Sequence, residues 1–173
     1  MDLAEGGWGE DQSPVGGAAT GPQPTDRGQG GTMRRVLTAG HGMPRAAVVA
    51  GAHRHDRKRL AATWDAAVLE RPAPTAEAPH QVCWDQGYDD EAWRQEAERR
   101  GDIPPRRSRG EAHQERRELP GDRARRWGVE VCHAWRHRFR KLLVRFETKL
   151  ATHLALLQCA CADMALKRAD VFR

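Results

Sequence analysis

Residues 122–146 carry the pattern that most restricts how this chain can fold. At about 100° per residue, a helix over this stretch separates its apolar side chains from its basic ones. The apolar stripe consists of Val131, Trp135, Phe139, Leu142, Leu143 and Phe146. The opposite face holds Arg123, Arg126, His137 and Lys141, with Glu130 as its lone acid. The pattern predicts one long amphipathic helix with a buried side and a basic, solvated side.

A single carboxylate among cations has two interpretations. The commoner one is a solvated face on which Glu130 pairs with Arg123 or Arg126 for a few tenths of a kcal/mol. The other is a metal-binding acid in a basic trough that holds phosphate groups. The helix alone does not decide between them.

The composition favours an anionic partner without proving one. The chain has 173 residues, enough for one domain, and a net charge of +5 that arginine mostly supplies. Arginine matches phosphate geometry, but a GC-rich genome would enrich arginine as well, and both explanations stay open. No apolar run is long enough for a membrane span, and no signal peptide is evident, so we expect a cytoplasmic protein without a membrane partner.

The four cysteines do not form a metal-binding pattern. Cys83, Cys132, Cys159 and Cys161 contain no CxxC pair and no histidine at zinc-type spacing. Free cysteines at apolar positions behave as small hydrophobic residues. We expect structural thiols.

The order of predicted elements indicates a mixed α/β fold. Residues 1–33 form a glycine- and proline-rich lead that we expect to be disordered. The rest is predicted as strands at 34–38, 45–50 and 82–84, and helices at 57–69, 89–100, 122–146 and 147–168, with 102–121 irregular. A ribonuclease H-like mixed sheet flanked by helices suits this order, provided that the lead contributes one more strand.

Two acids stand where phosphodiester chemistry would need them. Such chemistry uses two divalent ions about 3.5 to 4 Å apart, held by carboxylates that converge from distant parts of the chain. Asp85 ends the apolar run Val82-Cys83-Trp84, and Glu130 lies on a helix that packs. Each also has an ordinary explanation, because Asp before Gln-Gly is a common turn residue and Glu130 can form a surface ion pair.

Several short motifs occur along this chain in the order in which bacterial insertion-sequence transposases of the DDE type have similar motifs, and the chain therefore resembles that family. Asp85-Gln86-Gly87-Tyr88-Asp89 is similar to the family's second acid motif, and Arg126-Trp127-Gly128-Val129-Glu130 to its third. The segments 20–28, 36–44 and 51–56 continue the likeness. The resemblance implies a ribonuclease H-like catalytic domain over residues 34–173. It also implies Asp85 and Glu130 as catalytic acids and ligands of Mg²⁺ or Mn²⁺.

The first acid of the family is the main departure. Counting back without gaps from Pro14-Val15-Gly16-Gly17 places Gly7 at its position. We assign the role to Asp2, which needs several inserted residues, and regard Asp11 as a weaker substitute. Ile103-Pro104-Pro105 stands where a further strand is expected, although proline removes ladder donors. These departures predict an N-terminally truncated or degraded copy.

The implied partner is double-stranded DNA at the ends of the insertion sequence, and a homodimer is compatible with it. The predicted DNA contacts are Arg123, Arg126, Arg138 and Lys141. We interpret Trp64, Trp93, Trp127 and Trp135 as packing residues rather than as base-stacking ones. The rival functions are a DNA-binding protein that has lost its chemistry and a basic chain with no selected role.

Overall fold

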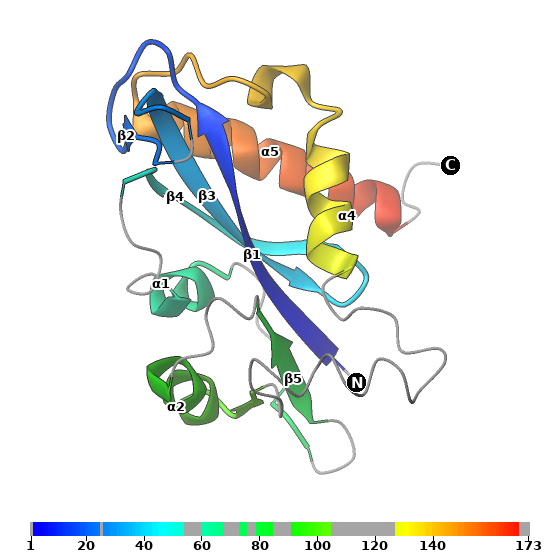
Figure 1. Cartoon of the computed structure of the whole chain (residues 1–173). Helices are drawn as coiled ribbons and strands as arrows, with labels where there is room; N and C mark the ends of the chain where they lie inside the picture. Colours follow the sequence, from blue (N-terminus) through cyan, green and yellow to red (C-terminus); the bar gives the residue numbers. More distant parts are fainter. Residues whose placement is uncertain are drawn as a thin grey trace, which may run out of the picture.

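The computed structural model describes residues 2–24, 26–53, 60–67, 73–75, 79–84, 91–104 and 127–169. These form one mixed sheet with helices on both faces (Figure 1). The strands are β1 (Asp2–Gln12), β2 (Gly21–Pro22), β3 (Gly30–Ala39), β4 (Pro44–Gly51), β5 (His80–Cys83) and β6 (Asp102–Ile103). The helices are α1 (Leu60–Asp65), α2 (Glu91–Arg99), α4 (Trp127–Arg136), the 3₁₀ turn η3 (Arg140–Leu142) and α5 (Leu150–Arg168).

The sheet is built outward from β1. Along one side, β3 pairs antiparallel with β1, and β4 pairs antiparallel with β3. Along the other side, β5 pairs parallel with β1, and β6 pairs parallel with β5. The order β4-β3-β1-β5-β6, with short β2 added to the start of β3, is that of a ribonuclease H-like α/β fold.

The N-terminal lead is the clearest correction to the sequence analysis. We expected residues 1–33 to be disordered, but residues 2–12 form β1, the strand between β3 and β5. Glycine weakens an isolated strand, yet a strand paired on both sides has its backbone groups satisfied by its neighbours. The condition that the lead supply a further strand is met, and the α/β class is confirmed.

Alternation along β3 divides the core into two layers. Leu37 packs on one face with Trp64 of α1 and Trp93 of α2. Val36 packs on the opposite face with Cys132 of α4 and Met164 of α5. Because successive strand residues point to opposite faces, these two neighbours fix which helices cover which side.

The long helix predicted over 122–146 is wrong beyond residue 136. α4 ends at Arg136, and the chain then turns through η3. The Arg136 guanidinium donates a 2.5 Å hydrogen bond to the carbonyl of Leu142, and Val144 bridges to Gln12 of β1. The stripe is therefore broken: Leu142 is buried, whereas Leu143 and Phe146 are 46% and 55% exposed.

The other predicted elements agree better. The two strands joined at residues 40–43, the strand before Asp85 and the helix α2 are confirmed, with Gly101 ending α2 at φ +75°. β6 has only two residues before the prolines. In α5, Leu157 and Met164 are buried as the stripe predicted. No helix among the described residues has the length and apolar character needed to cross a membrane.

Candidate active site on the α4 face of the sheet

Glu130 lies in the first turn of α4, which covers the Val36 face of the sheet. Its neighbours Val129 and Cys132 are buried, while Glu130 itself is exposed. Among the residues that the structure describes, Glu130 forms no ion pair. The exposed carboxylate is therefore available to a ligand, although the predicted partners Arg123 and Arg126 lie outside the described residues.

Asp85 also lies outside the described residues, but the strand that leads to it is in place. β5 ends at Cys83, which pairs with Glu5 of β1, and the following Trp84 is buried. The closeness of Asp85 to Glu130 stays a prediction.

The register of β1 separates the two positions considered for the first acid, Gly7 and Asp2. Gly7 pairs with Val36, whose side chain packs against α4, so position 7 lies on the same face as Glu130's helix. Asp2 pairs with His80 at the start of β5, and its place in the strand alternation is that of Gly6, which pairs with Leu37 on the α1 and α2 face. The role of Asp2 as the first acid stays a prediction.

Asp11 lies on the α4 side but is held by two arginines. It is 3% exposed, and its Oδ1 forms ion pairs with Arg34 of β3 and, at 3.1 Å, with Nη2 of Arg136 of α4. The Arg34 guanidinium covers Gly9, the neighbour of Arg34 in the β1–β3 register. We call Asp11, Arg34 and Arg136 the Asp11 cluster. Its single acid faces two cations.

Burial and the positive charges of the Asp11 cluster shift the pKa values of Arg136 and His133. Burial and the charge of Arg34 lower the pKa of Arg136 to about 10, although Asp11 acts in the opposite direction. Burial, followed by the charges of Arg34 and Arg136, lowers the pKa of His133 to about 4. His133 is therefore neutral at pH 7, and neither ring nitrogen has a hydrogen-bond partner within the described part of the chain.

These residues do not by themselves fit a divalent cation. Within the described ranges, no group of three or more His, Cys, Asp or Glu side chains is arranged to hold a metal ion. Asp11 is already paired with Arg34 and Arg136, and two buried guanidinium groups repel a cation. Any metal set would need Glu130 together with residues outside the described ranges.

The predicted DNA contacts differ in availability. Arg138 is exposed just beyond the end of α4. Lys141 is exposed in η3 but pairs with Glu147 at 3.0 Å. The predicted contacts Arg123 and Arg126 lie in residues that are not described. The cysteines are all free, as expected, and burial raises the pKa of Cys132 to about 12.

Sequence reasoning missed Arg34, Arg136 and His133. Arg34 stands inside an apolar strand, and its buried neighbour Arg35 stacks on Trp93 on the opposite face. A charged residue on the inner face of a central strand needs a partner, and that signal could have singled out Arg34. Arg136 and His133 were hidden because the helix was assumed to continue, with its basic side in solvent.

The strand order, with α4 packed on one face of the sheet, is that of the ribonuclease H-like class of α/β domains. Residues 10–163 match the family described as transposase DDE domain. Over 156 residues, the chain is 36% identical to a candidate transposase for insertion sequence element IS402 from Burkholderia cepacia, covering 87% of this chain and 72% of that protein. The chain belongs to the DDE transposase family, whose proteins act in DNA transposition and use divalent metal ions.

Proposed function

We propose that this protein binds the double-stranded ends of an insertion sequence, where Asp85 and Glu130 are two acids of a site for metal-dependent DNA strand cleavage and transfer. Mg²⁺ is the proposed ion, with Mn²⁺ as a substitute, since both accept carboxylate oxygen ligands. A homodimer on the two ends, in the cytoplasm, belongs to the same proposal.

We further propose that cleavage by this chain is weak, as expected of a degraded copy. One observation carries this: Gly7, the position of the family's first acid when the residues are counted back without gaps, pairs with Val36 on the α4 face and has no carboxylate. Of the other acids of β1 that the register places on that face, Glu5 pairs with Cys83 of β5, and Asp11 is occupied by Arg34 and Arg136. Removing one member of a cooperating catalytic set can lower the rate on the order of 10⁴-fold.

The test is a gain of activity. Gly7→Asp should raise Mg²⁺- or Mn²⁺-dependent nicking of DNA that bears the element's ends by on the order of 10² or more. Gly7→Asn is the matched control, because it adds nearly the same volume without a charge. The gain should disappear in Gly7→Asp combined with Asp85→Ala or with Glu130→Ala. Strong cleavage by the unaltered chain, abolished by Asp85→Ala and by Glu130→Ala, would contradict the proposal of an incomplete site.

The second candidate function is DNA binding without chemistry. It is favoured by the exposed Arg138 and by the positive excess of the Asp11 cluster. With about four to six phosphate contacts, the slope of log K against log salt should be about −4 to −5. A slope near zero would contradict both candidate functions, whereas a steep slope with no gain from Gly7→Asp would favour the second.

A further inference from the structure

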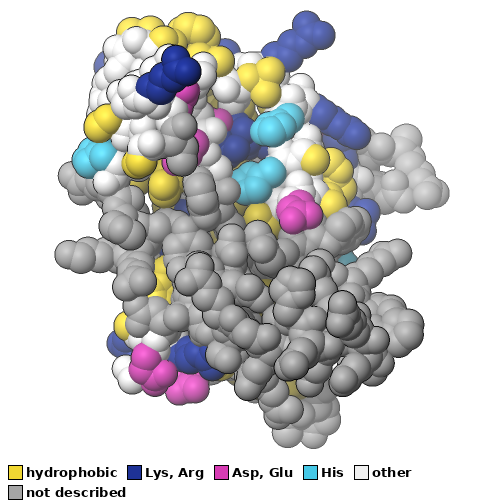
Figure 2. All heavy atoms as spheres, viewed as in Figure 1, with side chains coloured by type: hydrophobic (Ala, Val, Ile, Leu, Met, Phe, Trp, Pro, Cys, Tyr) yellow, Lys and Arg dark blue, Asp and Glu magenta, His cyan; other side chains and the backbone are white. Residues whose placement is uncertain are grey.

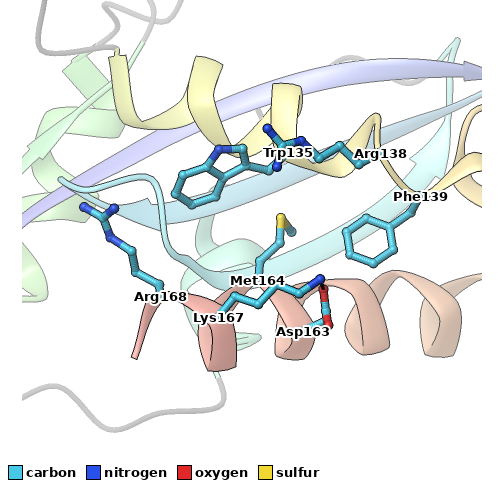
Figure 3. A pocket seen from close by; sticks show the side chains of 7 residues that line it. All are labelled: Trp135, Arg138, Phe139, Asp163, Met164, Lys167 and Arg168. Atoms are coloured by element: carbon cyan, nitrogen blue, oxygen red, sulfur yellow. Dashed lines mark ion pairs between the residues drawn. The ribbon is translucent and has the colours of Figure 1, made fainter. Parts of the chain in front are cut away.

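A hollow of about 360 Å³ lies between α4 and α5, at the end of α4 farther from Glu130. Figure 3 shows its side chains converging from the two helices. The lining residues are Trp135, Arg138, Phe139, Asp163, Met164, Lys167 and Arg168. Trp135, whose helical position predicted a packing residue, forms a wall of an open site with its ring.

The hollow combines aromatic walls with a positive rim. Trp135 and Phe139 come from α4 and the turn after it, and Met164 of α5 lies between the two helices (Figure 3). Asp163 forms an ion pair with Lys167, with 2.7 Å between Oδ2 and Nζ. Arg138 and Arg168 therefore remain as two cations that the one acid of the lining does not neutralise.

Arg168 and Trp135 form an incomplete sandwich. The Cζ atom of Arg168 lies 5.9 Å from the centre of the Trp135 ring. A flat ring between two planes needs about 7 Å, twice the stacking step of about 3.4 Å. Arg168 is exposed in the last turn of α5, so a shift of about 1 Å by this flexible side chain would admit a base.

We propose that this hollow binds one unpaired nucleotide of a DNA strand, its base stacked on Trp135 and its phosphate held by Arg138 and Arg168. Every base has a π face that stacks on an aromatic ring, and arginine pairs with phosphate. A volume of 360 Å³ is at the small end of ligand sites, which suits a single nucleotide. In a duplex the bases are already stacked on one another, so the hollow distinguishes an unpaired strand.

The choice of DNA as the ligand rests on the proposed function. The hollow adds a different specificity, because phosphate contacts alone would hold duplex and single strands in the same way. A strand that frays or is cut near Glu130 would present its unpaired end to the same helix.

The experiment compares a labelled 12-nucleotide oligothymidylate with a 12-base-pair duplex in fluorescence anisotropy titrations of the full chain. Trp135→Leu should weaken oligothymidylate binding about tenfold, while Trp135→Phe, which keeps an aromatic face, should weaken it less than about threefold. Arg168→Gln should weaken it about threefold or more. Duplex affinity should change by less than about twofold in Trp135→Leu, because phosphate contacts are retained.

Arg140→Gln is the matched control, because Arg140 is an exposed cation of η3 outside the hollow. It should affect duplex and oligothymidylate equally. The variants are compared only where their unfolding midpoints match that of the parent. The inference is overturned if Trp135→Leu and Arg168→Gln leave the affinity for oligothymidylate unchanged, or if they lower the affinities for oligothymidylate and duplex equally. Failure of the parent chain to bind the duplex would instead contradict the proposed function.

Discussion

Two buried arginine sites in this molecule are satisfied in different ways. Arg145, after η3, is fully buried, and none of its hydrogen bonds within the described residues is to a carboxylate. Its guanidinium donates to neutral acceptors: the carbonyls of Ala18, Ala19 and Glu147 and the hydroxyl of Thr32. On the α4 face, Arg34 and Arg136 instead share one oxygen of Asp11, whose Oδ2 accepts no hydrogen bond among the described residues.

The difference separates a residue that holds the fold from residues that the fold alone does not explain. Arg145 connects the chain after η3 to the turn that follows β1 and to Thr32 of β3. The Asp11 cluster leaves a surplus cation and unsatisfied atoms beneath α4, which a purely structural core would avoid. Figure 2 shows basic and histidine side chains on the face that includes α4.

The largest effect should come from removing Arg145. Arg145→Met removes the charged donor of four hydrogen bonds, and a hydrogen bond to a charged group contributes about 1.5–3 kcal/mol. The Ala19 carbonyl and the Thr32 hydroxyl keep other partners, which reduces the loss. We expect a loss of at least about 4 kcal/mol in the free energy of unfolding, measured by urea denaturation. Arg140→Met, at an exposed site, is the control. A loss below about 1 kcal/mol would remove the distinction between the two sites.

Asp11→Asn should have the next largest effect. It leaves Arg34 and Arg136 facing each other without a counter-charge, which typically costs about 3–5 kcal/mol for a buried pair. Replacing all three by apolar residues, as Asp11→Leu with Arg34→Met and Arg136→Met, should restore stability to within about 1 kcal/mol of the parent. If the triple variant is as unstable as Asp11→Asn, the cluster holds the fold as Arg145 does.

His133 should give the Asp11 cluster a dependence on pH. Its pKa is lowered from 6.5 to about 4 in the folded protein, so the unfolded chain takes up a proton first as the pH falls. This contribution to stability is complete above pH 6.5 and is lost as the pH falls towards 4, by up to about 3 kcal/mol. His133→Gln should flatten the curve of unfolding free energy against pH, and the exposed-site control His41→Gln should not. If the curves of unfolding free energy against pH were equal for both variants, the pKa of His133 would not be lowered by its burial beside the arginines.

The sequence predicted what depends on local pattern and missed what depends on pairing. The strand runs at 34–38 and 45–50 and the α5 stripe have strong periodicity, and the structure agrees with them. β1 was missed because its glycines carry no apolar pattern, and its stability comes from β3 and β5 on either side. The end of α4 was missed because Arg136 turns inward to Asp11, which is far from it in the sequence, and to the carbonyl of Leu142 in the turn that follows the helix.

The smallest effect on stability should come from Glu130. It is exposed in the first turn of α4 and has no ion pair within the described ranges, so Glu130→Ala loses only its interaction with the helix dipole, about 0.3–1 kcal/mol. Alanine's higher helix propensity offsets part of that loss. The unfolding free energy should therefore change by less than about 0.5 kcal/mol in urea denaturation. Because Asp11→Asn is expected to lower stability and Glu130→Ala is not, the two acids of this face would then have different roles. A loss above about 2 kcal/mol for Glu130→Ala would make Glu130 a structural residue as well, and its assignment as an acid of the site would lose its support.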